Sequence, residues 1–156
     1  MTVVVLDANV LAPGFVGQAS VSVRLIDRWR AGAYELVVSE HLLGELARTF
    51  TDPYYRARVS TEQASRILKL LRSEARLTPM TVTVSGVATQ PKDDLVLATC
   101  LSAEASYLAT RDKQLLKLGA YQGLQILHPG DLLDLLLATI ADEPERTRPQ
   151  TGTLAA

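Results

Sequence analysis

The chain has 156 residues, 47% of them hydrophobic, and a formal net charge of −1. This length suits one domain with a sizeable core, and the near-neutral charge excludes a basic surface over the whole molecule but not a local basic patch. No apolar run reaches membrane-spanning length, no basic segment precedes the first apolar run, and the single cysteine excludes an internal disulfide. We therefore expect a cytoplasmic protein without membrane association.

Strand-like and helix-like segments alternate along the chain, as judged from apolar periodicity, cap residues and turn formers. In the first half we expect, in order, a strand at residues 3–6, a loop at Pro13-Gly14 and Gly17, a helix from Ser20 or Ser22 to near Gly32, a strand at 35–38, a helix from Ser39 to about residue 49, a break at Asp52-Pro53 and a helix capped by Thr61. In the second half we expect a strand at 80–84, a helix from Asp93 to about residue 104, strands at 107–110 and 124–127, and a helix opened by Pro129-Gly130-Asp131.

This alternation predicts an α/β fold, with five strands in a central parallel sheet and helices on both of its faces. Residues 1–141 are expected to form this single domain. From Asp142 the sequence becomes polar and includes Pro144 and Pro149, so residues 142–156 are predicted to be a disordered tail.

Four acidic residues fall at comparable positions relative to these elements. Asp7 ends the first strand, Asp112 follows the fourth, Asp94 lies in the first turn of a helix, and Glu45 lies within the helix that follows the second strand. Ligands of open parallel sheets bind beyond the carboxyl ends of the strands, where these side chains are expected. Gathered carboxylates repel one another, and Mg²⁺ or Mn²⁺ reverses that penalty. The pattern predicts a metal centre that activates water against a phosphodiester.

Each acid, taken alone, also has a purely structural interpretation. Asp93 and Asp94 suit a helix N-terminus, Asp112 suits an N-cap, and Glu45 suits a solvated helix position. Asp7 is the hardest to explain in this way, because an acid at the end of a buried strand has little structural purpose. The four positions together favour a site over four separate coincidences.

Four segments resemble, in order and spacing, the motifs of PIN-domain ribonucleases. They are Val5-Leu-Asp-Ala-Asn-Val-Leu11, Ser39-Glu-His-Leu-Leu-Gly-Glu-Leu46, Lys92-Asp-Asp-Leu-Val-Leu-Ala98 and Tyr107-Leu-Ala-Thr-Arg-Asp112. The similarity is greatest to bacterial PIN proteins that are toxin components of toxin–antitoxin systems. It implies a three-layer α/β/α sandwich, Mg²⁺- or Mn²⁺-dependent endoribonuclease activity on RNA, a cognate antitoxin and a homodimer. The last helix, which is apolar on more than one face, suits either a dimer contact or burial within its own domain.

The resemblance also assigns the site residues. The residues that it implies to be both catalytic and metal-binding are Asp7, Glu45, Asp94 and Asp112. Within the second motif Glu45 is preferred to Glu40, which lies at the start of the helix. Within the third motif Asp94 is preferred to Asp93, because Asp94 directly precedes the apolar helical run. Whether Asp93 replaces or assists Asp94, and whether one or two metal ions bind, stays open at this point.

Several further residues are candidates for supporting roles. Asn9 and Thr110 are expected to hold the metal ligands by hydrogen bonding. Arg56 and Arg58 lie in a segment that mixes arginine with tyrosine, as an RNA-contacting loop does, although packing of the tyrosines explains the segment slightly better. His41 lies one helical turn before Glu45, a position from which it would reach the site.

Two other functions are compatible with a strand that ends on an aspartate. A haloacid-dehalogenase-like phosphatase would use Asp7 as its nucleophile, but such enzymes usually carry a second aspartate two residues later, where this chain has Asn9. A non-catalytic PIN-like binding module is the other alternative, and the intact set of four acids argues against it.

Overall fold

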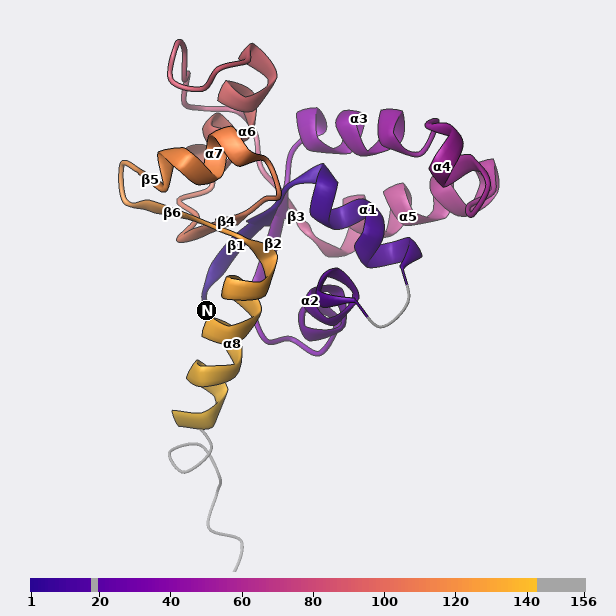
Figure 1. The fold of residues 1–156 in the computed structure, drawn as a ribbon, viewed down its shortest axis with the longest axis horizontal. Coiled ribbons are helices and arrows are strands. Elements are labelled where there is room, and N and C mark those ends of the chain that lie inside the picture. The colour runs from indigo at the N-terminus through magenta and orange to yellow at the C-terminus, as the bar shows by residue number, and fades with distance from the viewer. Residues whose placement is uncertain (18–19, 143–156) are drawn as a thin grey trace, which may run out of the picture.

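A six-stranded sheet runs through the middle of the molecule (Figure 1). In the computed structural model, which describes residues 1–17 and 20–142, the strand order is β3-β2-β1-β4-β6-β5. Every neighbouring pair is parallel except β5 with β6. The predicted α/β fold is confirmed, with six strands rather than five. The strands are β1 (Val3–Leu6), β2 (Glu35–Val38), β3 (Arg76–Leu77), β4 (Tyr107–Ala109), β5 (Ala120–Tyr121) and β6 (Leu124–Leu127).

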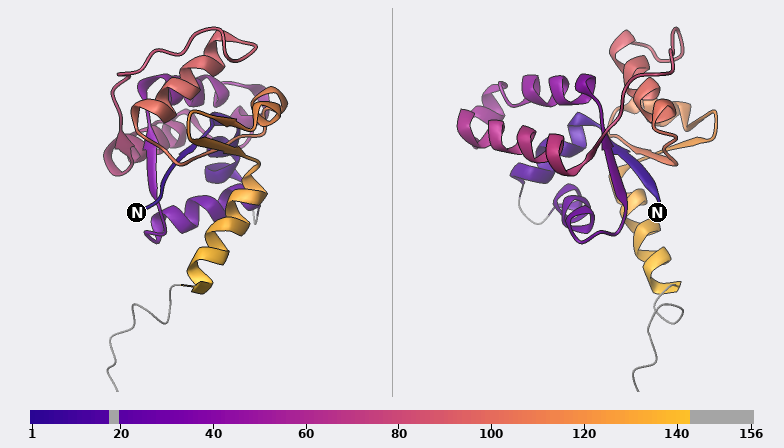
Figure 2. Two further views of the ribbon diagram at one scale, coloured as in Figure 1. Left: turned by 90° about the vertical axis from the view of Figure 1, so that its left-hand side faces the viewer. Right: turned by 180° about the vertical axis from the view of Figure 1, so that it is seen from behind.

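Helices cover both faces of the sheet, as the views in Figure 2 show. Helices α1, α2, α3, α5 and α8 contribute to the hydrophobic core on one face, and α6 and α7 contribute to the core on the other. The arrangement is the expected three-layer sandwich. In the described part of the chain the helices are α1 (Ala8–Val16), α2 (Val21–Arg30), α3 (Glu40–Thr49), α4 (Pro53–Arg56), α5 (Thr61–Glu74), α6 (Pro91–Ser102), α7 (Lys113–Leu118) and α8 (Pro129–Asp142).

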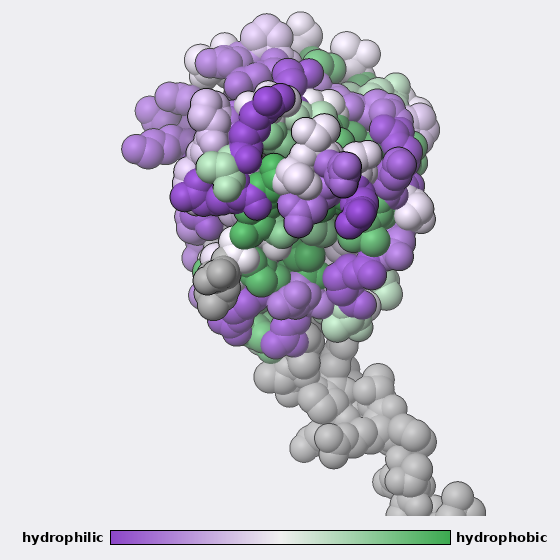
Figure 3. Space-filling view, turned by 90° about the vertical axis from the view of Figure 1, so that its right-hand side faces the viewer, coloured by the Kyte–Doolittle hydropathy of each residue, from purple (hydrophilic) through white to green (hydrophobic). Residues whose placement is uncertain are grey.

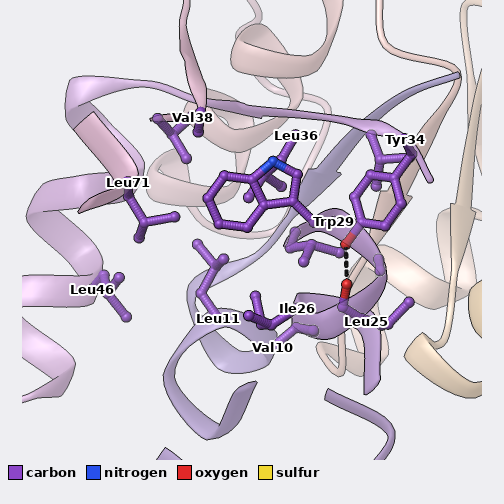
Figure 4. Close-up of a cluster of buried hydrophobic side chains, with 14 of the residues drawn as sticks. Val10, Leu11, Leu25, Ile26, Trp29, Tyr34, Leu36, Val38, Leu46 and Leu71 are labelled. Atoms are coloured by element: carbon purple, nitrogen blue, oxygen red, sulfur yellow. Dashed lines mark hydrogen bonds between the residues drawn. The ribbon is translucent and has the colours of Figure 1, made fainter. Parts of the chain in front are cut away.

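The first strand is buried on both faces because its alternate side chains enter different cores. Val4 and Leu6 pack with α1 and α2, whereas Val5 packs with α6. Figure 4 shows the larger core, where the Tyr34 hydroxyl donates a 2.6 Å hydrogen bond to the carbonyl of Leu25. Each fully buried aliphatic side chain stabilises the fold by roughly 1.5–3 kcal/mol. This two-sided burial explains why the strand reads as an unbroken apolar run.

The prediction of a strand at residues 80–84 is wrong. Strand β3 takes the edge position instead, and the chain after it runs beside α6. There the N–H groups of Thr81 and Val82 donate to the Ser102 hydroxyl rather than to a strand. The short strand β5 escaped prediction because its two-residue turn, Gln122-Gly123, lacks the usual Asn-Gly signal; both residues nevertheless have the positive φ of such a turn.

The loop predicted at Pro13-Gly14 is also wrong, because α1 continues through both residues to Val16; only Gly17, its C-cap, lies outside the helix as expected. A proline inside a helix removes one backbone hydrogen bond, and packing must offset that loss. Gly14 allows this packing: a Cβ built at this position would lie 2.6 Å from Cγ1 of Ile26 on α2. Close approach of the two helices, rather than a turn, is what the glycine serves.

Most helix starts agree with the sequence. Ser20 and Ser39 cap α2 and α3 as expected, but α5 is capped by Ser60, one residue before Thr61, with Gln63 completing a capping box. Leu132, Leu133 and Leu136 of α8 are buried within the chain's own core.

Two predictions concern the ends and the surroundings of the chain. Helix α8 ends at Asp142, so that residue belongs to the helix, and the rest of the expected tail, 143–156, lies outside the described residues. No helix in the described ranges is both long and apolar enough to cross a membrane.

Candidate active site

The strand order places the candidate site at the point where the chain reverses its direction across the sheet. From β1 the chain moves to β2 and β3 on one side, and then returns to β4 on the other side of β1. Crevices beyond the carboxyl ends of strands at such a switch point are the usual binding sites of open α/β sheets. Leu6 pairs with Ala109 at the ends of β1 and β4, so Asp7 and Thr110, the next residues, leave the sheet side by side.

A hydrogen-bond network fixes the carboxylate of Asp7 at this edge. Its Oδ1 accepts from the backbone N–H of Ala8 at 2.8 Å, and its Oδ2 accepts from the Thr110 hydroxyl at 2.8 Å. The same Thr110 oxygen accepts from the N–H of Asp112 at 3.0 Å and from the Asn9 amide at 3.4 Å. Thr110 therefore contacts Asp7 and Asp112 directly, whereas Asn9 bonds to Thr110 and accepts from the N–H of Arg111 at 3.1 Å.

Asp112 begins α7, and Glu45 comes from the middle of α3. Asp112 caps α7 with Oδ1, which accepts from the N–H groups of Gln114 and Leu115, each at 2.9 Å. Both hydrogen bonds of the helix cap thus use the same carboxylate oxygen, and Oδ2 takes no part in the cap. The side chain of Glu45 is 18% exposed, and its Oε1 lies 3.4 Å from Nε2 of His41.

Two hydrogen bonds connect the N-terminal part of α3 to α6. The hydroxyls of Ser39 and Thr99 lie 2.8 Å apart in the interior, and Nε2 of His41 lies 3.0 Å from the carbonyl oxygen of Lys92. Because Ser39 caps α3 and Lys92 precedes Asp93, both links set the position of Glu45 relative to the start of α6. His41 therefore reaches the site, in contact with both helices.

Asp93, rather than Asp94, faces the other acids, although the sequence favoured Asp94. Asp7, Glu45 and Asp112 all raise the pKa of Asp93 electrostatically. Asp94 points elsewhere: its carboxylate accepts from the backbone N–H groups of three successive loop residues, Gly86, Val87 and Ala88, at 3.0, 3.2 and 2.7 Å.

The two acids differ in their direction around α6. Asp93 lies four and seven residues before Leu97 and Cys100, which pack in the core beneath the sheet, so the three share a helix face. Asp94 is turned about one hundred degrees away, towards the loop that its carboxylate holds.

Burial and mutual repulsion both act on the carboxylates. Asp7 is 5% exposed, and this burial raises its pKa above the ordinary value. The hydrogen bonds from Thr110 and Ala8 lower the pKa of Asp7, whereas the negative charges of Glu45 and Asp112 raise it. Burial is also the largest cause of the raised pKa of Asp93, followed by Asp112 and Asp7. Buried acids that repel one another are a costly arrangement unless a cation joins them.

The donor set fits a hard divalent cation. All four acids, with Asp93 as the third, offer carboxylate oxygens, the ligands that Mg²⁺ and Mn²⁺ prefer. In residues 1–17 and 20–142 no three acidic, histidine or cysteine side chains are already close enough to form a complete cage. Mg²⁺ usually keeps several waters and needs only one or two protein carboxylates, so a preformed cage is not required.

A groove of about 610 Å³ opens beside Glu45. Its walls come from α3, the α4 segment and the start of α6, and the lining residues are His41, Glu45, Arg48, Thr49, Asp52, Tyr54, Tyr55 and Lys92. Two of these, Arg48 and Lys92, are cationic. Glu45 is the one candidate acid in this lining, and the two cations suit the phosphates of a phosphate-bearing chain.

The two arginines predicted to contact substrate lie apart from each other. Nη1 of Arg58 donates to the carbonyl of Tyr54 at 2.7 Å, and its guanidinium carbon lies 3.6 Å from the centre of the Tyr54 ring. Arg56 lines a separate cavity of about 240 Å³, together with Phe50 and Val59 and without any of the four acids. Tyr55 packs edge-on against Phe50, as the packing interpretation expected.

The molecular surface near α1, α4 and α5 combines apolar and polar side chains. Figure 3 shows apolar surface gathered between polar side chains on this side. One shallow cavity here, of about 340 Å³, is lined by Phe15, Val16, Val59 and Ile67 together with Arg58, Gln63 and Arg66.

Comparisons with solved structures show the same fold. VapBC2 from Rickettsia felis, bound to a DNA fragment from their promoter, matches with a TM-score of 0.58 and 13% identity, over 81% of this chain and 98% of that chain. VapBC-1 from nontypeable Haemophilus influenzae matches with a TM-score of 0.56 and 17% identity, over 83% and 99%. PAE2754 from Pyrobaculum aerophilum gives 0.53 and 19%, over 88% and 96%.

Sequence comparison identifies the family. No curated protein gave a significant match. The sequence model of the PIN domain matches residues 3–114, more than half of the chain, and this range contains all four carboxylates together with Asn9 and Thr110. With the fold, the switch-point site and the motif order in agreement, the chain belongs to the PIN domain family.

Proposed function

We propose that this protein is a metal-dependent endoribonuclease that hydrolyses RNA phosphodiester bonds. The observation that carries the proposal is the placement of buried Asp7 and Asp93 with Glu45 and Asp112 at the switch point of the sheet, next to a groove that contains the cations Arg48 and Lys92. Carboxylates brought together in this way fit a divalent cation, and the cations Arg48 and Lys92 in the neighbouring groove suit the phosphates of a polyanionic substrate. The cofactor we propose is Mg²⁺ or Mn²⁺.

Each of the proposed site residues would have a role that follows from its position. Asp7 and Asp93 would be the main metal ligands, Asp112 would complete the shell directly or through water, and Asp94 would position Asp93 by anchoring the loop before α6. A bound divalent cation supplies Lewis-acid stabilisation of the phosphate and an activated water. Glu45, held by His41, would accept a hydrogen bond from the attacking water and orient it.

RNA cleavage by matched variants tests the proposal. Wild type with Mn²⁺ should cut single-stranded RNA, whereas Asp7→Asn should lose activity by at least two orders of magnitude, since its charge is needed to hold the metal. Thermal melts provide a second readout, because Mn²⁺ should stabilise wild type and not Asp7→Asn. Equal RNA cleavage by the two proteins would overturn the assignment.

We further propose that the nuclease is the toxin of a toxin–antitoxin pair and forms a homodimer in the cytoplasm. The motif resemblance and the likeness to the VapBC structures support a protein partner. Co-expression with the product of the adjacent small reading frame should yield a stable complex in which RNA cleavage is inhibited. Light scattering should give twice the chain mass for the isolated protein. A monomer that shows no inhibition by the neighbouring product would contradict this part of the proposal.

A further inference from the structure

The groove beside Glu45 contains an aromatic side chain that the proposed hydrolysis does not use. Tyr54 is 56% exposed, so its ring is accessible to a ligand. It lines both the 610 Å³ groove and a neighbouring cavity of about 370 Å³, so it stands between them. Its position at the start of α4 is fixed, because its N–H donates to Oδ1 of Asp52 at 3.0 Å.

The ring of Tyr54 is braced on the side away from Glu45. The Arg58 guanidinium lies over the ring and donates to the carbonyl of Tyr54, and Arg58 lines the neighbouring cavity but not the 610 Å³ groove. Tyr55 meets the ring edge-on, with centroids 5.0 Å apart. A ring held in this way loses little freedom when a ligand stacks on it, and the side towards the groove is available for stacking.

Two cationic side chains, from two different helices, line the same groove. Arg48 comes from α3, where its guanidinium lies 3.7 Å from Glu45 and its side chain is 70% exposed; Lys92 comes from the first turn of α6, directly before Asp93. In the described residues Lys92 forms no salt bridge, so its charge is not neutralised by a carboxylate within the chain.

We propose that this groove is a nucleotide subsite for single-stranded RNA, in which Tyr54 stacks on the base beside the cleaved bond while Arg48 and Lys92 bind the flanking phosphate. The inference rests on the proposed ribonuclease function and adds to it the part of the substrate that is recognised. Stacking on an aromatic ring tolerates every base, and a lysine or arginine binds phosphate without reading sequence. The groove volume lies within the usual range of small-ligand sites, roughly 300–1,000 Å³.

Binding of fluorescent single-stranded RNA hexamers, measured by anisotropy in the Asp7→Asn background, tests the subsite without cleavage. Tyr54→Ala should weaken binding roughly 5- to 100-fold, whereas Tyr54→Phe, which keeps the ring, should bind as the parent does. Lys92→Ala should weaken binding and reduce the salt dependence by about 0.7 in slope. Lys69→Ala, which removes an exposed lysine of α5, is the matched control and should change neither.

Abasic RNA separates stacking from a merely structural role of the tyrosine. In a series of hexamers, one abasic site is placed at each position in turn. The Asp7→Asn parent should bind weakly to the hexamer with the abasic site at one particular position. With that hexamer, Tyr54→Ala should cause no further loss of affinity. Unchanged binding by Tyr54→Ala, or equal losses on intact and abasic RNA, would overturn the subsite, as would a lack of RNA binding by the parent. Wild type that cuts RNA while Tyr54→Ala binds normally would leave the nuclease proposal intact and reject only the subsite.

Discussion

The hydroxyl of Thr110 donates a 2.8 Å hydrogen bond to Oδ2 of Asp7, although the two residues are 103 positions apart in the chain. The bond joins the ends of β1 and β4, the two strands on either side of the switch point, and Thr110 is completely buried. Through its contacts with Asn9 and Asp112, the same hydroxyl also connects three of the proposed site residues. It is the central connection of the site.

Replacing Thr110 should therefore affect stability and activity together. Thr110→Val keeps the shape but removes the hydroxyl, so Asp7 loses a hydrogen-bond donor; we expect a loss of about 1–3 kcal/mol in the free energy of unfolding and at least a tenfold loss of RNA cleavage. Thr110→Ser restores the hydroxyl and should recover most of the activity. Urea unfolding and cleavage kinetics measure the two effects. Similar cleavage rates for the valine and serine variants would contradict a role for the hydroxyl.

The adjacent acids Asp93 and Asp94 should respond to substitution in opposite ways. Asp93→Asn removes a repelled charge, so it should abolish cleavage and leave the metal-free protein at least as stable as wild type. Asp94→Ala leaves three loop N–H groups without their acceptor and should destabilise the fold by roughly 1–3 kcal/mol.

Thermal melts and cleavage assays on the two variants check this division. Mn²⁺ should still raise the melting temperature of Asp94→Ala, whereas it should not raise that of Asp93→Asn. If Asp94→Ala were as stable as wild type but inactive, the sequence-based choice of Asp94 as a metal ligand would be right after all.

The stability of the metal-free protein should fall as the pH rises. Burial raises the pKa values of Asp7 and Asp93 in the folded state above the ordinary value of 3.8, so the folded protein holds these protons to higher pH than the unfolded chain does. Their contribution to stability is therefore fully present below about pH 3.8 and is lost as the pH rises through the folded pKa values.

Urea unfolding from pH 4 to 7 with a chelator measures this contribution. The free energy of unfolding of wild type minus that of Asp7→Asn/Asp93→Asn should become more negative with increasing pH, and Mn²⁺ should reverse the trend for wild type alone. A difference that does not change with pH would mean that the two acids are not destabilised by burial.

Two helical glycines should differ in their response to alanine. In α1, Gly14→Ala would place a Cβ 2.6 Å from Ile26 and should destabilise the protein by about 1–3 kcal/mol. In α3, Gly44→Ala meets only the Arg48 side chain at 3.7 Å and should stabilise it by roughly 0.5–1 kcal/mol. Chemical denaturation of the two variants compares them directly. A stabilising effect at Gly14 would show that α1 and α2 do not approach as closely as described.

Local sequence determined most of the helices and strands, because each depends on interactions within a few residues. The run from Val3 to Leu6 reads as a buried strand, and Ser20 and Ser39 begin helices because their hydroxyls cap the first turn. The order of the acidic positions also follows from the sequence. Their type and spacing were sufficient to indicate a metal-binding edge, since parallel strands bring their carboxyl ends together.

Tertiary structure decided the features that depend on contacts between distant segments. Pro13 and Gly14 look like a turn, but packing against Ile26 keeps them helical, and residues 80–84 look like a strand, but the Ser102 hydroxyl takes their N–H groups. In each case a residue far away in the chain supplies the deciding interaction.

The same distinction applies to the third acid of the site. The sequence determined that a pair of acids begins α6, and either Asp93 or Asp94 satisfies the favourable dipole at a helix N-terminus. Only the tertiary structure chose between them: the loop at residues 86–88 gives Asp94 three hydrogen-bond donors, and the other face of the helix turns Asp93 towards Asp7. The choice depends on side-chain direction around a helix, which is fixed only when the sheet and the loop pack on its two sides.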